Sequence, residues 1–244
     1  TVTRGKLEML RRGGINRISF GVQSFDDELL GRIGRIHSGA EAKAAVKLAR
    51  QAGFDNISLD LMYGLPGQSL NQLKASVETA LALEIEHISI YGLQLEEGTM
   101  LAKLSQQGTL ELPAEESVEM MYDYITGELP RCGYARYEIS NFARSGFASR
   151  HNLGYWLDRP YIGLGAAAHS YYQNRRFANM AAADEYIANV FSGVPVAFEE
   201  ERMTREILME EFCFLALRTS QGILADAFAL KFDCSLSSVY GEII

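Results

Sequence analysis

Residues 56–68 read NISLDLMYGLPGQ. The first part, 57–62, alternates bulky apolar residues with small or polar ones, which is typical of a β-strand whose two faces meet different surroundings. The turn at 64–67, rich in glycine and proline, ends that strand. Two further segments, 18–23 (ISFGVQ) and 88–91 (ISIY), repeat the pattern. We therefore predict three equivalent strands, each with one apolar and one polar face.

An amphipathic helix is predicted between each pair of strands, over residues 39–53 and 69–84. Each begins after a serine, Ser38 or Ser69, that is followed three residues later by Glu or Gln, the pattern of a capping box. Strands that alternate with helices predict a parallel sheet. A sheet covered by helices on both faces requires nearly continuous apolar strands, which these are not. We therefore predict an α/β fold in which the strands form about half of a barrel with a polar lumen.

The pattern changes after the third strand. A helix is predicted over 113–129, a single strand over 134–144, a short helix over 182–192 and a long amphipathic helix over 199–219. The predicted domains are a half-barrel at 1–112, an extension at 113–198, and a truncated, mainly helical C-terminal region at 199–244.

Composition limits the classes of ligand and location. The formal net charge is −8, with 23 basic and 31 acidic residues, so duplex nucleic acid is not an expected partner. No run of 18 apolar residues and no secretory signal pattern is present, so we expect a cytoplasmic protein without a membrane anchor. The three cysteines, Cys132, Cys213 and Cys234, are far apart in sequence and predict free thiols rather than a disulfide framework or a metal site.

Two polar residues mark a candidate ligand site. In parallel α/β folds ligands meet the carboxyl ends of the strands. Gln23 and Asp60 are predicted to point to the same face at corresponding depths in adjacent strands. A carboxylate directed inward is costly unless it is paired or faces a ligand. Arg35, in the loop before the second strand, is a structural alternative as partner of Asp60.

Several motifs in fixed order resemble a known family. The segments 16–25 (NRISFGVQSF), 31–38 (GRIGRIHS), 56–68 and 88–101 (ISIYGLQLEEGTML) are similar to the second half of the radical S-adenosylmethionine (SAM) barrel in the HemN/HemW superfamily. The match runs from about residue 16 to residue 169. It implies that the half-barrel is the second half of a partial (β/α)6 TIM-like barrel.

The resemblance also implies a binding site for SAM. In that family the matching glutamine, arginine and aspartate bind SAM, which carries over to Gln23, Arg35 and Asp60. Asp60 suits the ribose hydroxyls, while Gln23 and Arg35 suit the amino-acid carboxylate. More weakly, Gly64 and Gly67 are expected to leave room for the adenine beside the turn.

One family feature is missing from the sequence. Reductive cleavage of SAM requires a [4Fe–4S] cluster held by a Cys-x3-Cys-x2-Cys loop, and these 244 residues contain no such loop. We therefore expect no radical catalysis from this chain as it stands, and expect the cluster only in a full-length parent. The sequence leaves two explanations open, a fragment of a longer parent and a degenerate homologue that has lost the cluster.

The stretch 149–170, SRHNLGYWLDRPYIGLGAAAHS, carries a second set of motifs. Residues 163–168 fit the dinucleotide pattern G-x-G-x-x-A, but no helical pattern follows them, so that interpretation is rejected. The arrangement HNxxYW followed by GxGAxAHS resembles the signatures of the HemW-type haem chaperones within the superfamily.

That second resemblance implies a haem site. His151 is the candidate axial ligand of the haem iron, and Tyr155 and Trp156 are candidates for contact with the porphyrin face. The small residues that follow would admit a flat ring closely. For His169 we favour a buried histidine of the core.

The resulting hypothesis is a HemW-like haem chaperone that binds SAM and haem and delivers haem to acceptor proteins, with peripheral contact to membrane-bound acceptors. The alternative is an oxygen-independent coproporphyrinogen III dehydrogenase on the same scaffold. A SAM-binding barrel with another substrate is a third possibility.

Overall fold

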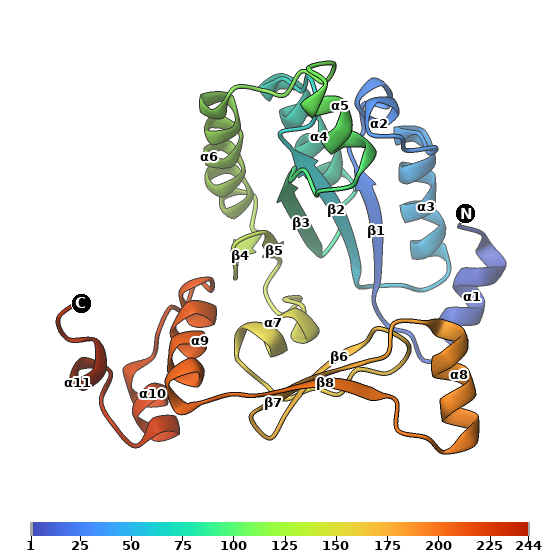
Figure 1. Cartoon of the computed structure of the whole chain (residues 1–244). Helices are drawn as coiled ribbons and strands as arrows, with labels where there is room; N and C mark the ends of the chain where they lie inside the picture. Colours follow the sequence, from blue (N-terminus) through green and yellow to red (C-terminus); the bar gives the residue numbers. More distant parts are fainter. Residues whose placement is uncertain (1, 244) are drawn as a thin grey trace. The chain divides into compact units, whose positions relative to one another are not determined.

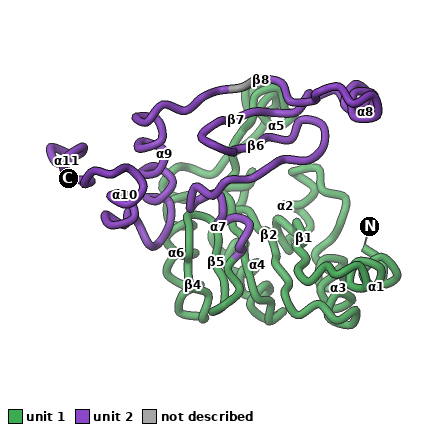
Figure 2. Tube along the Cα trace, turned by 90° about the horizontal axis from the view of Figure 1, so that it is seen from below, with its two compact units in different colours: residues 1–148 green, residues 149–244 purple. Residues whose placement is uncertain are grey.

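The computed structural model describes residues 2–243, apart from the side chains of residues 199 and 200. These residues form two compact units, 1–148 and 149–244 (Figure 2). The boundary between the units falls inside the predicted extension at 113–198. The three-domain division of the sequence stays a prediction.

The first unit is built on a five-stranded sheet (Figure 1). Its strands β1 (Ile18–Gln23), β2 (Ile57–Tyr63) and β3 (His87–Gly92) are parallel and adjacent in chain order. β5 (Asn141–Ala143) then pairs with β3 in the antiparallel sense, and β4 (Ala135–Arg136) pairs with β5. The predicted α/β class and the three parallel strands are confirmed.

Helices α3 (Gly39–Gln51) and α4 (Leu70–Ala82) begin where their capping boxes predict. The hydroxyl of Ser38 accepts a hydrogen bond from the third residue of α3 at 3.2 Å, and that of Ser69 does the same in α4 at 3.3 Å. Both caps satisfy backbone N–H groups that the helix itself leaves free. The remaining helices of this unit are α1 (Arg4–Arg12), α2 (Asp27–Arg32), α5 (Met100–Gln106) and α6 (Glu115–Arg131).

The core of the first unit lies between the apolar face of the sheet and helices α3, α4 and α6. Alternate strand residues point into it, as the period-two pattern predicts. Each fully buried aliphatic side chain contributes about 1.5–3 kcal/mol to folding. The buried residues include Val22, Leu59, Leu61, Ile88 and Ile90 from the strands and Val46, Leu73, Val77, Met121, Ile125 and Leu129 from the helices.

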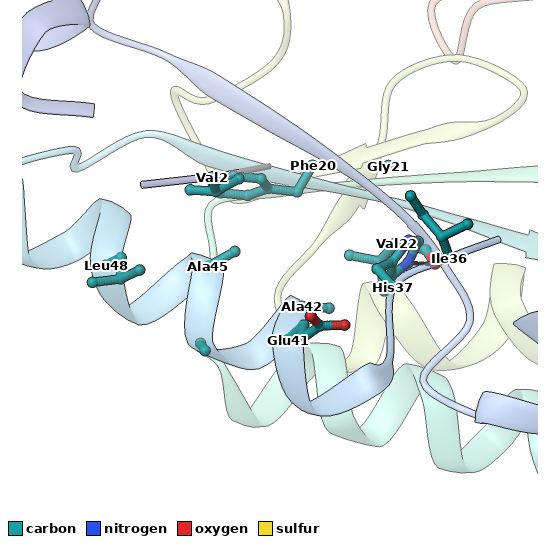
Figure 3. Close-up of a pocket in the computed structure, with 11 residues that line it drawn as sticks. Val2, Phe20, Gly21, Val22, Ile36, His37, Glu41, Ala42, Ala45 and Leu48 are labelled. Carbon is teal, nitrogen blue, oxygen red and sulfur yellow. Dashed lines mark hydrogen bonds between the residues drawn. The ribbon is translucent and has the colours of Figure 1, made fainter. Parts of the chain in front are cut away.

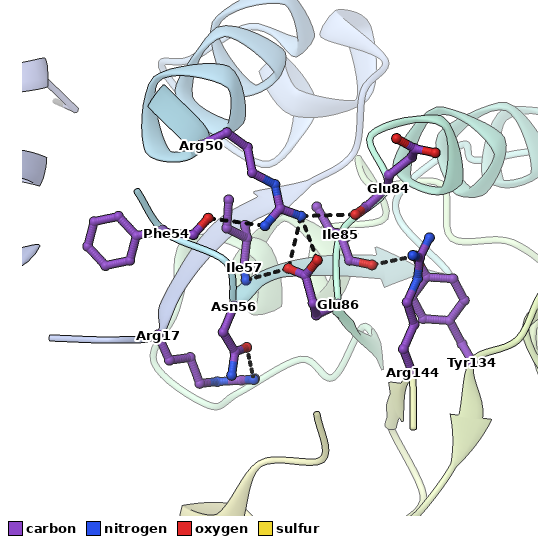
Figure 4. Close-up of polar contacts among 10 residues, drawn as sticks. All are labelled: Arg17, Arg50, Phe54, Asn56, Ile57, Glu84, Ile85, Glu86, Tyr134 and Arg144. Carbon is purple, nitrogen blue, oxygen red and sulfur yellow. Dashed lines mark hydrogen bonds and ion pairs between the residues drawn. The ribbon is translucent and has the colours of Figure 1, made fainter. Parts of the chain in front are cut away.

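A half-buried ion pair lies at the amino ends of the strands (Figure 4). Arg50, in the last turn of α3, contacts both carboxylate oxygens of Glu86 at 2.7 and 2.9 Å. The same guanidinium donates to the carbonyl oxygens of Phe54 and Glu84. Glu86 in turn accepts from the backbone N–H of Ile57 at 2.9 Å. Because one guanidinium nitrogen of Arg50 contacts both oxygens of Glu86, and Glu86 accepts from Ile57, this ion pair ties the start of β3 to the start of β2.

The second unit contains a three-stranded antiparallel sheet of β6 (His169–Tyr172), β7 (Arg175–Asn179) and β8 (Ala197–Arg202). Helix α7 (Arg150–Trp156) precedes it, and α8 (Ala183–Ser192) connects β7 to β8. The predicted helix over 182–192 is confirmed by α8.

Helices complete the second unit. They pack around an apolar cluster that includes Tyr171, Met209, Phe228 and Phe232. Three of the rings, Phe212, Phe228 and Phe232, lie within 5.8 Å of one another. These helices are α9 (Arg205–Leu217), α10 (Ala225–Phe232) and α11 (Leu236–Tyr240).

Two local predictions are wrong, and one pair of strands was not predicted. The single strand predicted over 134–144 is two short strands joined by a turn at 137–140. The helix predicted over 199–219 begins only at Arg205, because the residues before it pair with β7. The β6–β7 hairpin was not predicted; its turn, Gln173 and Asn174, places both residues at positive φ without the usual glycine.

Candidate functional site

The polar face of the first sheet carries one continuous row of residues. Gly21 lies beside Asp60, Asp60 beside Ser89, and Ser89 beside Asn141, so the row crosses β1, β2, β3 and β5. We call these four residues the polar row. Gly21 is exposed, Asp60 is half-buried, and Ser89 and Asn141 are each 4% exposed. The row therefore runs from an open end on β1 to a closed end on β5.

Asp60 is available to a ligand. Its carboxylate accepts one hydrogen bond, from the hydroxyl of Ser19 at 3.0 Å. Arg35 is exposed in its loop, and within residues 2–243 no ion pair joins it to Asp60. The structural alternative, in which Arg35 partners Asp60, is therefore wrong for this structure. The structure does not bring these two residues together.

The position of Gln23 relative to the polar row is set by an irregularity in β1. A β-bulge places Gln23 opposite Leu61 rather than level with Asp60, so the predicted equal depth is wrong. Its φ is +66°, which turns the chain out of the strand direction. A Cβ built on Gly21 would lie 3.0 Å from the Gln23 amide nitrogen, so the amide folds back over Gly21. The Gln23 amide therefore lies beside Gly21, the residue of the polar row that pairs with Asp60.

The backbone conformation of the turn after β2 requires glycine at two positions. Gly64 and Gly67 have φ of +73° and +64°, a conformation that glycine adopts without strain. The space beside Gly67 is filled by Arg32, because a Cβ there would lie 1.9 Å from its guanidinium. Arg32 donates to the carbonyl oxygen of Pro66 at 3.0 Å. The room that was expected here for adenine is therefore occupied by a side chain.

A buried histidine lies one row below, and the sequence analysis missed it. The two ring nitrogens of His87 hydrogen-bond to the hydroxyls of Ser58 and Tyr137, each at 2.8 Å. Burial lowers the pKa of His87 to about 3, with a smaller contribution from the nearby Arg17 charge. His87 is therefore neutral at physiological pH and links the parallel strands to the β4–β5 turn. His87 directly precedes the alternating segment 88–91. That position next to a predicted strand was the sequence feature that could have indicated a buried histidine.

In the second unit, α7 presents His151 and Tyr155 together. Their rings meet edge to face at 4.9 Å, and both residues are exposed. The rings of Tyr161 and Tyr155 also meet edge to face, at 4.7 Å. Trp156 instead lies under the guanidinium of Arg218 at 5.6 Å. The structure thus brings together two of the three predicted haem-contacting residues; Tyr161 is a further ring that the motif did not predict.

The glycine-rich loop after α7 is explained by backbone packing. A Cβ on Gly163 would lie 2.2 Å from the carbonyl oxygen of His169, and Gly165 has φ of +107°. The side-chain amide of Asn179 donates to the carbonyl oxygens of both glycines. His169 itself is exposed on β6, so its predicted place in the core is wrong.

The cysteines do not fit an iron–sulfur cluster. Cys132 is exposed at the end of α6, and Cys213 and Cys234 are half-buried thiols in the second unit. Across residues 2–243, no group of three His, Cys, Asp or Glu side chains could hold a metal ion. The residues of this chain therefore do not supply the ligands of a [4Fe–4S] cluster.

One hollow of about 480 Å³ lies elsewhere, between β1 and α3 (Figure 3). Its walls are mainly apolar and include Phe20, Val22, Ala45 and Leu48. His37, at its rim, hydrogen-bonds to the carbonyl oxygen of Val22 at 3.0 Å. None of the predicted SAM-binding residues lines this hollow.

Sequence comparisons agree with the predicted resemblance. Residues 1–80 match the model of the Radical SAM superfamily. The chain is 42% identical over 240 residues to "Heme chaperone HemW" of Bacillus subtilis, covering 98% of this chain and 63% of the relative. It is 39% identical to the protein of the same name from Lactococcus lactis, covering 97% and 62%. The chain thus spans less than two thirds of the length of these curated relatives. Within residues 2–243, no helix is long and apolar enough to cross a membrane.

A solved structure shares the fold. Coproporphyrinogen III oxidase (HemN) from Escherichia coli, titled a radical SAM enzyme, superposes with a TM-score of 0.80 at 19% identity. The superposition covers 99% of this chain and 58% of that one, and it supports a mixed α/β fold of the same kind. The sequence matches confirm the predicted resemblance: residues 1–80 match the radical SAM superfamily, and relatives named heme chaperone HemW are among the homologues of this chain.

Proposed function

We propose that this chain is the part of a HemW-like haem chaperone that binds SAM and haem. The observation that carries the proposal is the 42% identity, over nearly the whole chain, to a protein named heme chaperone HemW. The exposed His151, with Tyr155 packed against its ring, is the geometry that the haem-binding part of this proposal requires.

The superfamily implies SAM and a [4Fe–4S] cluster as cofactors. For SAM, the proposed binding residues are Gln23, Arg35 and Asp60, with Asp60 accepting from the ribose hydroxyls and the other two holding the amino-acid carboxylate. More weakly, we propose that the turn at Gly64 lies close to the adenine; at Gly67 that space is taken by Arg32. Since the cluster ligands are not among the residues of this chain, no radical step is assigned to it.

For the fold, we propose that β1, β2 and β3 are the second half of a partial (β/α)6 barrel. Two observations support this. The strands are parallel in chain order, and the helices cover their apolar face while polar residues occupy the other. A sheet of this kind, with one apolar and one polar face, suits a barrel wall with a lumen better than a flat sheet covered on both sides.

For haem, the proposed ligand is the imidazole of His151, which binds iron in its neutral form. Tyr155 holds the ring from one edge, and we propose contacts of Tyr155 and Trp156 with the porphyrin. The bound haem would then pass to haem-accepting proteins in the cytoplasm or, through peripheral contact, at the membrane. An exposed ligand suits such a transfer, because the acceptor must reach the iron site.

Haem titration followed by the Soret absorption band tests this proposal. The parent chain is expected to bind haem at one equivalent, and His151→Ala to bind it at least about tenfold more weakly, since it removes the axial ligand. His169→Ala is the matched control, because it removes a second exposed histidine of the same unit. Equal affinity of the parent and His151→Ala would refute the assignment.

The alternative function is an oxygen-independent coproporphyrinogen III dehydrogenase. The fold likeness to coproporphyrinogen III oxidase favours it, although 19% identity supports only the fold. An assay for protoporphyrinogen IX formation by the full-length parent separates the two. Formation of that product would replace the chaperone proposal with the dehydrogenase.

A further inference from the structure

Arg218, in the second unit, carries a charge that no acidic side chain balances. It directly follows the last residue of α9, and its guanidinium lies over two rings, Trp156 at 5.6 Å and Phe214 at 4.8 Å. Its Nε atom is buried and has no hydrogen-bond partner among residues 2–243. No carboxylate in the described part of the chain forms an ion pair with it. Arg218 is therefore a half-buried cation that lacks an anion among these residues.

The surroundings of Arg218 hold its guanidinium in place without satisfying it. A charge that leaves water is stabilised in proteins by an opposite charge and by hydrogen bonds. An aromatic face attracts a guanidinium, but it is only a weak acceptor of hydrogen bonds. Another arginine of this unit, Arg176, has the usual arrangement, an ion pair with Glu211 at 2.8 Å. Stacking on two rings therefore fixes the position of the Arg218 donors and leaves them available to an anion.

The position of Arg218 connects it to the candidate haem site. Trp156, one of its two rings, is the last residue of α7, the helix that presents His151 and Tyr155. Helix α7 packs against α9 (Figure 1). His151 and Trp156 are separated by roughly 7.5 Å along the axis of α7, given the rise of an α-helix. The carboxylates of a haem stand at one edge of its ring, at a comparable distance from the iron.

The two helix ends around Arg218 also expose apolar side chains. Leu157, which follows Trp156, is 44% exposed, while Phe214 and Leu217 at the end of α9 are 58% and 69% exposed. Covering such side chains with an apolar ligand is favourable, and a guanidinium is well suited to bind a carboxylate. A cation among exposed apolar side chains therefore suits a flat apolar ring that carries carboxylates at one edge, which is the chemistry of haem.

We propose that the guanidinium of Arg218 binds a propionate carboxylate of haem while His151 binds the iron. The terminal nitrogens of Arg218 make this contact, because its Nε is closed off from solvent. Trp156 and Phe214 hold the plane of the guanidinium. The inference rests on the proposed binding of haem through His151, and it adds a residue that determines which way the ring lies on that ligand.

Soret titration with an esterified haem tests the contact directly. Haem dimethyl ester keeps the iron and the ring but has no ionised propionate. The parent chain is expected to bind haem at least about tenfold more tightly than the ester, since the ester loses a hydrogen-bonded pair of opposite charges. In Arg218→Gln this preference for haem is expected to fall to within about twofold. Because the preference is a ratio of two affinities of one variant, a lower fraction of folded chain leaves it unchanged.

Two further variants separate the possible outcomes. His151→Ala removes the iron ligand and not the carboxylate contact, so it should weaken haem and the ester by the same factor and keep the preference. Arg159→Gln removes another exposed arginine of the same unit and is the control, which should also keep the full preference. A parent that binds haem without preferring it to the ester, or an Arg218→Gln variant that keeps the preference, overturns the inference alone. A parent that does not bind haem overturns the proposed haem site together with it.

Discussion

At the scale of single residues, the buried imidazole of His87 makes stability depend on pH. Its pKa is about 3 in the folded chain against 6.5 in the unfolded chain, because burial disfavours the charged ring. The unfolded state therefore binds the proton first, and stability is lost as the pH falls from 6.5 toward 3. Urea unfolding at pH 7 and pH 4 should show a loss of about 3 kcal/mol from this group.

The variant His87→Gln tests the source of that loss. It removes the titrating ring, so its free energy of unfolding should be lower at pH 7 and should change less between pH 7 and pH 4. His169→Gln serves as the comparison, because that histidine is exposed. A pH dependence in His87→Gln as steep as that of the parent would show that other groups dominate.

Single residues also show which parts of the candidate site could be predicted from the sequence alone. Asp60 was predicted because period-two alternation puts it on the polar face, and that face is where it lies. The bulge at Gln23 could not be read from the pattern, because a positive φ at glutamine has no local signal. Asn141 was missed for another reason. It reaches the row through antiparallel pairing of β5 with β3, which depends on contacts distant in sequence.

At the scale of elements, the capping box of α4 makes a measurable contribution to the free energy of unfolding. Ser69 accepts from the N–H of Gln72, whose side chain accepts from the backbone N–H of Ser69 in return. Ser69→Ala should therefore lower the free energy of unfolding by about 1 kcal/mol, as measured by urea denaturation. Ser145→Ala, in an exposed loop, is the reference substitution. Equal midpoints for the two variants would mean that packing alone defines the start of α4.

The elements that were predicted well are those specified by neighbouring residues. Helices α3 and α4 have caps and apolar stripes, and both begin within one residue of the predicted position. The segments 134–144 and 199–219 were misassigned for related reasons. The strands in the first are short and the strand in the second is strongly charged, and all of them depend on pairing with partner strands. β5 has only three residues, and its strand conformation depends on pairing with β3.

At the scale of the whole molecule, each proposed site lies within one unit. Gln23, Arg35 and Asp60 belong to residues 1–148, and His151 and Tyr155 to residues 149–244. Binding energies at sites that share no residues are usually additive. We therefore expect Asp60→Ala to weaken SAM binding by about tenfold or more while haem affinity changes less than about twofold. His151→Ala should do the reverse.

Isothermal titration of both variants with SAM, and Soret titration with haem, measure the four affinities. If either substitution weakens both ligands by similar factors, the two sites are coupled through the chain, and each ligand must then favour binding of the other by the same factor. That outcome would point to haem binding controlled by SAM. Independent affinities would instead make the first unit a separate cofactor-binding module, with haem loading determined by residues of the second unit alone.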